Sequence, residues 1–229
     1  MQKVNSISFL SGVIKNNAVI AAVLIFGMLL IFLLTGIGQD PLQYVHSISN
    51  YRDILLHNPG TLKFAIGLDN AFILFYLTIF LALGLMISKL GNLNILGKAA
   101  ILLIFTTGIL DILENMHFLT MISSAQEGFI VSENEIKVQV WESLIKFHIS
   151  YIGFYLLSYV LPTTTIQEKI LCFLLRWFQW PVGMLIYITP IEIAKPLVLV
   201  RFAFFLTALI LLLTINFNQH YKKVSLDNQ

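Results

Sequence analysis

The sequence predicts an all-α integral membrane protein, a six-helix transmembrane bundle with both termini in the cytoplasm. Hydrophobic residues make up 58% of the chain and charged residues only 11%, whereas soluble domains carry roughly 25% charged residues. Apolar runs recur at about 20 residues, the length that crosses a bilayer. Lysine and arginine are also biased toward alternate loops. These three observations predict that the chain lies in a membrane, how many times it crosses the bilayer and on which side its termini lie.

The 229 residues fit a single polytopic membrane domain, because spans and short connections leave no room for a separate soluble domain. No internal repeat divides the chain into the two inverted halves that many transporters have. The six predicted spans are residues 18–36, 66–88, 98–122, 138–161, 168–189 and 197–215.

The first span carries no charged residue, and its apolar run is too long for a signal peptide, so we interpret it as an uncleaved anchor. The connection 43–56 mixes apolar and polar residues, which predicts an amphipathic helix that lies on the membrane or covers a cavity. Among the prolines, Pro190 and Pro196 fall between predicted spans. Pro181 lies inside the fifth span, where we expect a kink.

Orientation follows from the positive charges of the loops. Cytoplasmic loops of membrane proteins carry an excess of Lys and Arg. Seven such residues lie on the side of the two termini and four on the opposite side, which places both termini in the cytoplasm. The two sets are Lys3, Lys15, Lys89, Lys98, Lys169, Lys222 and Lys223 against Arg52, Lys63, Lys137 and Lys195.

Composition also narrows the partners and the compartment. A net charge of +2, scattered along the chain, does not indicate nucleic-acid binding. The lone Cys172 has no second cysteine with which to form a disulfide or a metal site. Membrane lipids are therefore the expected partners, and association into a homo-oligomer stays open. The compact size, without organelle-targeting signals, favours a bacterial inner (plasma) membrane.

The most informative segment is 108–120, where ionisable residues interrupt an apolar helix. Asp111, Glu114 and Asn115 stand at i, i+3 and i+4, on one face of that helix, and His117 lies at the edge of the same face. An ionisable group in hydrocarbon costs a few kcal/mol or more. Such a stripe therefore needs partners, a cavity or a function.

Other spans bring polar residues to the same depth. When the chain is threaded back and forth, polar residues from four helices fall in the outer half of the bilayer, whereas the inner halves hold few. Glu142 and Lys146 also stand four apart in the order that favours an ion pair. The sequence thus predicts a shared polar pocket in the outer half, built by Asp69, Asn70, Asp111, Glu114, Asn115, His117, Glu142, Lys146 and Arg201.

Metal binding and charge balance both explain this cluster. The Glu114-x-x-His117 step occurs in di-metal helical bundles, which use it on two helices, but here it occurs once. One divalent metal ion held by His117, Glu114 and Asp111, with Asp69, stays open. Alternatively the acids pair with Lys146, Arg201 and Arg176 and hold the helices together.

Three classes of function remain. We favour a protein that binds or acts on a lipid or small apolar substrate, because scarce polar groups in the inner halves indicate a blind pocket. Asp111, Glu114 and Asp69 are its catalytic candidates, and Asn70, Asn115, Glu142, Lys146 and Arg201 its binding candidates. The alternatives are a proton- or cation-coupled transporter and a structural or assembly membrane protein.

Overall fold

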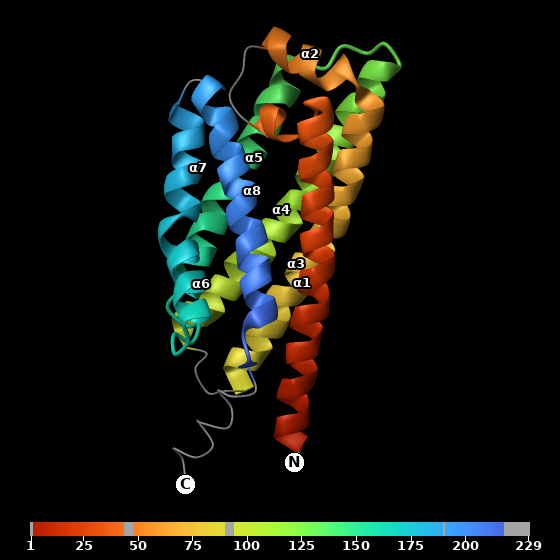
Figure 1. Cartoon of the computed structure of the whole chain (residues 1–229). Helices are drawn as coiled ribbons and strands as arrows, with labels where there is room; N and C mark the ends of the chain where they lie inside the picture. Colours follow the sequence, from red (N-terminus) through yellow and green to blue (C-terminus); the bar gives the residue numbers. More distant parts are fainter. Residues whose placement is uncertain (1, 44–47, 90–93, 190, 218–229) are drawn as a thin grey trace.

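The computed structural model describes residues 2–43, 48–89, 94–189 and 191–217, and within these ranges it consists of helices and connecting turns, without strands (Figure 1). Neighbouring long helices run antiparallel. The elements in chain order are α1 (Gln2–Thr35), the 3-10 helix η1 (Asp40–Gln43), α2 (Ile48–His57), α3 (Pro59–Lys89), α4 (Ile95–Gln126), α5 (Glu133–Leu157), α6 (Ile166–Trp177), α7 (Gln179–Ile188) and α8 (Ile191–Thr214).

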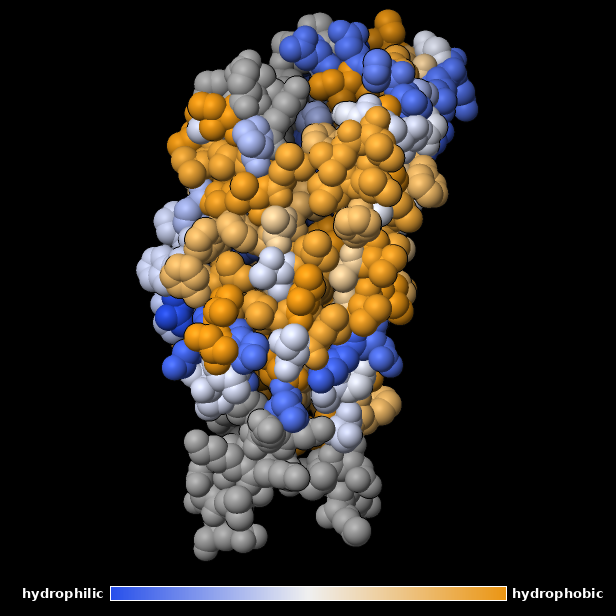
Figure 2. All heavy atoms as spheres, viewed as in Figure 1, coloured by the Kyte–Doolittle hydropathy of each residue, from blue (hydrophilic) through white to orange (hydrophobic). Residues whose placement is uncertain are grey.

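The chain is an integral membrane protein with several apolar helices. Five helical segments of the described residues are long and apolar enough to cross a bilayer, and Figure 2 shows a broad apolar band between two polar ends. The sixth predicted span, 138–161, overlaps α5, which is long but more polar than the others. The five segments are Ser6–Thr35, Pro59–Lys89, Ile95–Gln126, Ile166–Ile188 and Pro196–Thr214.

Side-chain caps fix where three of the helices begin. Asn94 accepts a hydrogen bond from the backbone of Gly97 at 3.0 Å, and Ser132 accepts one from Glu135 at 3.2 Å. Thr165 and Glu168 form a capping box at the start of α6. Each cap satisfies backbone donors that the first turn of a helix leaves without a partner.

The expected interruption of the fifth span is present, but it is a break at Phe178 between α6 and α7. Proline clashes with the carbonyl of the residue four positions earlier, which for Pro181 is Trp177, the last residue of α6. The prediction that Pro196 precedes the sixth helix is wrong, because α8 begins at Ile191 and includes Pro196. Neighbouring helices make such prolines tolerable in a bundle.

The connection after α1 closes one end of the bundle. Helix α2 lies across that end (Figure 1), and its Tyr51 and Leu55 are buried against Phe118 of α4 in one apolar cluster. Arg52 donates to the carbonyl of Val131, with Nε and Nη2 at 3.1 and 2.5 Å. The predicted amphipathic helix is therefore confirmed for residues 48–57, and it covers the end of the bundle; residues 44–47 lie outside the described residues.

Helices α5 and α7 are in close contact at Gly183. The Tyr151 hydroxyl of α5 lies against this glycine, in the space that a Cβ would occupy. We expect Gly183→Ala to destabilise the protein by about 1–3 kcal/mol, because the methyl group must displace Tyr151. Thermal unfolding in detergent, followed by circular dichroism, measures this. Gly67→Ala in α3 is the matched control, since nothing lies within 4 Å of the added Cβ there; equal melting temperatures would contradict the close contact.

Candidate functional site

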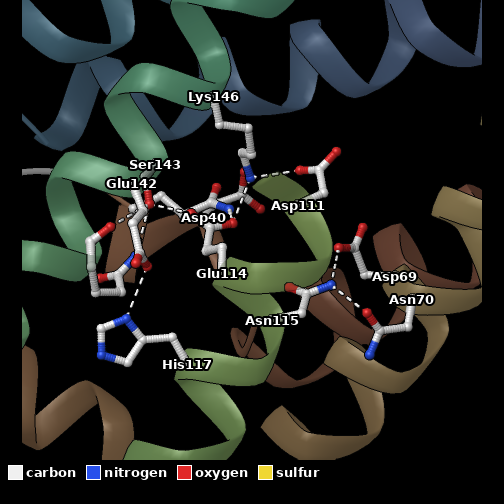
Figure 3. A network of polar contacts seen from close by, with 12 residues as sticks. Asp40, Asp69, Asn70, Asp111, Glu114, Asn115, His117, Glu142, Ser143 and Lys146 are labelled. Carbon is white, nitrogen blue, oxygen red and sulfur yellow. Dashed lines mark hydrogen bonds and ion pairs between the residues drawn. The ribbon is translucent and has the colours of Figure 1, made fainter. Parts of the chain in front are cut away.

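Glu114 is the centre of the polar cluster (Figure 3). Its carboxylate is fully buried and receives hydrogen bonds from Gln43 Nε2 at 2.9 Å, from Lys146 Nζ at 2.5 Å and from the Ser143 hydroxyl. Gln43 belongs to η1, and the other two donors belong to α5. One carboxylate of α4 thus holds both the neighbouring helix and the segment that closes the bundle.

Lys146 also neutralises a second carboxylate of α4. Its Nζ lies 2.9 Å from Asp111 Oδ1, and the Tyr76 hydroxyl of α3 donates to Asp111 Oδ2 at 2.5 Å. The expected ion pair between Lys146 and Glu142 is not formed. Lys146 is 4% exposed and lies between the buried Glu114 and the partly buried Asp111 of α4, and its ammonium pairs with these two carboxylates.

The network continues from Ser143 toward α2. Gln139 Nε2 donates to the Ser143 hydroxyl at 2.7 Å, and the Tyr51 hydroxyl donates to Gln139 Oε1 at 2.7 Å. Burial raises the pKa of Tyr51 far above its ordinary value, and the charge of Glu114 adds to this effect. Tyr51 is therefore a neutral hydrogen-bond donor, and it connects α2 to the same cluster.

A second group of polar side chains joins α3 to α4. Asn115 Nδ2 donates to Asp69 Oδ2 at 2.8 Å and to Asn70 Oδ1 at 3.0 Å. The amide of Gln39 forms a further hydrogen bond with Asp69. The structure therefore brings together Asp69, Asn70 and Asn115, as the sequence predicted.

Arg201 of α8 pairs with Asp40 of η1, and Nη2 lies 2.7 Å from Asp40 Oδ1. Its guanidinium carbon lies 4.7 Å from the centre of the Phe147 ring, and Lys146 Nζ lies 4.5 Å from the same centre. Arg201 is thus close to the cluster, as predicted. Its carboxylate partner comes from the connection after α1, which the sequence did not single out.

His117 and Glu142 form a separate pair between α4 and α5. His117 Nδ1 lies 2.9 Å from Glu142 Oε2, and His117 Nε2 lies 3.9 Å from Glu135 Oε1. His117 is therefore not placed with Glu114 and Asp111, whose carboxylates share the ammonium of Lys146. In the part of the chain that the structure describes, no three His, Cys, Asp or Glu side chains are arranged to hold a metal ion. The predicted ligand set is not assembled there.

An internal cavity of about 180 Å³ reaches this cluster from within the bundle. Four predicted site residues line it, namely Asp69, Asp111, Lys146 and Arg201. The other five predicted residues do not line it: Asn70, Glu114, Asn115, His117 and Glu142. Further polar residues of the same wall include Gln39, Asp40, Gln43 and Tyr76.

Most of the remaining cavity wall is apolar, and its polar members are Thr107, Ser150 and Gln179. On α3 the lining runs from Asp69 to Leu83, and on α8 from Arg201 to Leu212. At 1.5 Å per helical residue these stretches are about 20 Å and about 17 Å long. Five phenylalanine rings belong to this wall: Phe72, Phe80, Phe154, Phe202 and Phe205. The cavity is thus a long apolar slot with charged groups at one end.

A second hollow, an open groove of about 780 Å³, lies next to the charged end. We call it the outer groove. Phe32, Ile37, Gly38 and Asp40 line both the outer groove and the cavity, so the two adjoin at the end of α1. The carboxylate that pairs with Arg201 stands at this junction.

Sequence reasoning missed seven residues of the network, among them Gln39, which precedes Asp40 in the connection after α1. Gln139 and Ser143 precede Lys146 by seven and three residues, so helical spacing alone places all three on one face of α5. Asp40 and Gln43 lie in a connection without periodicity, where no sequence pattern indicates that they reach the cluster. Tyr51 and Tyr76 resemble ordinary apolar packing residues in the sequence. Comparison of the chain with protein-family models, curated proteins and solved structures gives no match.

Loss of the Lys146 ammonium tests whether the cluster supports the fold. We expect Lys146→Met to destabilise the protein by about 3–5 kcal/mol, since the buried Glu114 and the partly buried Asp111 lose their counter-charge. Thermal unfolding in detergent is the measurement. Adding Glu114→Gln to Lys146→Met should restore part of the loss, because one of the uncompensated charges is removed.

The matched control is Lys137→Met on the same helix. Lys137 pairs with Glu133 at 2.6 Å on an exposed surface, where ion pairs contribute little. We expect no measurable change in its melting temperature. If Lys146→Met and Lys137→Met unfold at the same temperature, the buried ion pairs do not hold α4 against α5.

Proposed function

We propose that this chain is a six-span membrane protein that binds a lipid-like amphiphile within its helical bundle. The ligand's apolar body occupies the slot, and its polar head lies at the cluster of Asp69, Asp111, Lys146 and Arg201. The observation that carries this proposal is the cavity wall, which changes from apolar to charged along its length. A molecule with the same division of polarity fits that wall.

We propose that α5 is the sixth helix that crosses the membrane. Its charged Lys146 and its polar Gln139 and Ser143 contact other described groups inside the protein, which reduces the cost of placing this helix in hydrocarbon. The start of α1 and the end of α8 lie at the same end of the bundle (Figure 1), which supports an even number of crossings. With the loop charges, we propose cytoplasmic termini, a polar cluster in the outer half, and a bacterial inner membrane.

Binding is better supported than a chemical reaction. Glu114 does not line the cavity, and both oxygens of Asp111 are engaged, one by Lys146 and one by Tyr76. A general base needs a free oxygen within hydrogen-bond reach of its substrate. We therefore assign Asp69 and Asp111 to contact with the ligand, and Glu114 and Asn115 to holding the helices.

The dimensions of the slot favour a lipid chain. The hydrocarbon core of a bilayer is about 30 Å thick, so one leaflet accommodates chains of about 15 Å, close to the length of the lined stretches. The end remote from the charges is lined by leucines such as Leu161, Leu171 and Leu212. These residues offer no polar path through the described bundle, which supports binding over transport. A purely structural role would not require a cavity.

A phenylalanine placed in the slot tests this function. Ala208 lines the cavity, so Ala208→Phe should fill the slot and reduce copurifying lipid at least about tenfold, a loss of about 1.4 kcal/mol in binding. Lipid is extracted from the detergent-purified protein and quantified by mass spectrometry.

Ala203→Phe makes the same change on an exposed face of α8 and should retain the lipid of the parent. Equal lipid content in the parent and both variants, with all three folded, would sink the proposed function.

A further inference from the structure

We propose that the head of this amphiphile is a cation of the alkylammonium type, received by Asp69 at the polar end of the cavity. The inference rests on the proposed function and names the class of ligand for the same site. It follows from the charge balance of the cluster, the partners of Asp69 and the lining of the outer groove.

Acids outnumber bases at the polar end. Lys146 is shared by Asp111 and Glu114, and Arg201 is paired with Asp40. Among the described residues, the polar end therefore contains four carboxylates, those of Asp40, Asp69, Asp111 and Glu114, and two cations, Lys146 and Arg201. Two negative charges are in excess. Uncompensated charge is costly in a low-dielectric interior, so a cationic ligand is favoured over an anionic one.

Asp69 is the cavity-lining carboxylate without an ion-pair partner among the described residues. It lines the cavity, and the hydrogen bonds that it receives come from the amides of Asn115 and Gln39. Among the salt bridges of the described residues, none involves Asp69. An ammonium group in the cavity would supply the counter-charge that the chain's own lysine and arginine give to other acids.

Hydrogen-bonding capacity points the same way. Gln39 lines the cavity beside Asp69, and its Oε1 is buried without a donor within the described structure. A primary ammonium carries three donors and no acceptor, whereas a carboxylate head would add acceptors. Phe72 and Tyr76 follow Asp69 on the same cavity wall, and aromatic faces attract cations.

The outer groove has a matching charge. Its lining contains the carboxylate of Asp53, the Asp40 carboxylate that pairs with Arg201, and His57, and it includes no lysine or arginine among the residues that the structure describes. Arg52, next in sequence to Asp53, instead donates to the carbonyl of Val131. An amphiphile that approaches the cavity through this groove therefore meets negative charge before it reaches Asp69, which favours cations during entry.

Three probes with the same alkyl chain test the head group: octadecylamine, octadecanol and stearate. Binding to the detergent-purified full chain is measured by native mass spectrometry at neutral pH. We expect octadecylamine to bind at least about tenfold more tightly than either of the others. Asp69→Asn keeps an acceptor for Asn115 and should abolish this preference, whereas Glu133→Gln, an exposed acid-to-amide change, should retain it.

The outcomes separate this inference from the proposed function. If octadecanol or stearate binds the parent as tightly as octadecylamine, the cationic head is overturned, and loss of that binding in Ala208→Phe leaves the cavity as the binding site. If Ala208→Phe binds every probe like the parent, the cavity is not the site and both proposals fail. If Asp69→Asn does not fold, the order of the three probes on the parent decides the question.

Discussion

The polar end of the bundle depends on one buried ammonium group. Lys146 of α5 lies between Asp111 and Glu114 of α4, whose side chains are 16% and 1% exposed. Two carboxylates in an apolar bundle would repel each other and lose hydration, and one lysine offsets both effects. With Glu114 neutralised in this way, its remaining acceptor capacity binds Ser143 and Gln43, so η1 and the connection after α1 are held at the same place.

The spacing of acids on α4 divides their roles. Residues three positions apart on a helix differ by about 60° in direction, so Asp111 and Glu114 share a stripe and yet face different neighbours. Glu114 turns toward α5 and η1, and its side chain is enclosed. Asp111 turns toward α3 and the cavity, where Tyr76 completes its hydrogen bonding. Asn115, the residue after Glu114, donates a hydrogen bond to Asp69 of α3 and holds it at the cavity wall.

Sequence reasoning reached the membrane class, the convergence of Asp69, Asp111, Glu114, Asn115 and Lys146, and an amphipathic helix in the first connection. It failed to predict which charged side chains pair, because pairing depends on how the helices pack in three dimensions. Glu142 was expected to pair with Lys146 on spacing alone, but the packing of α4 against α5 gives Glu142 to His117. Asp40 and Gln43 were beyond reach because irregular connections carry no periodic signal. Ser143 and Gln139 were within reach, since both repeat with Lys146 on one helical face.

Under the proposed function, the surplus of carboxylates gives the cavity a thermodynamic role beyond enclosing a ligand. A folded protein that buries more acids than bases gives up part of its stability to hold them, and that part is recovered when a cation binds the folded form alone. Ligand binding and folding are then coupled through Asp69, whose amide partners Asn115 and Gln39 fix its position without pairing its charge. Paired acids such as Glu114 hold the helices, and Asp69, without an ion-pair partner among the described residues, gives the proposed site its preference for a cation.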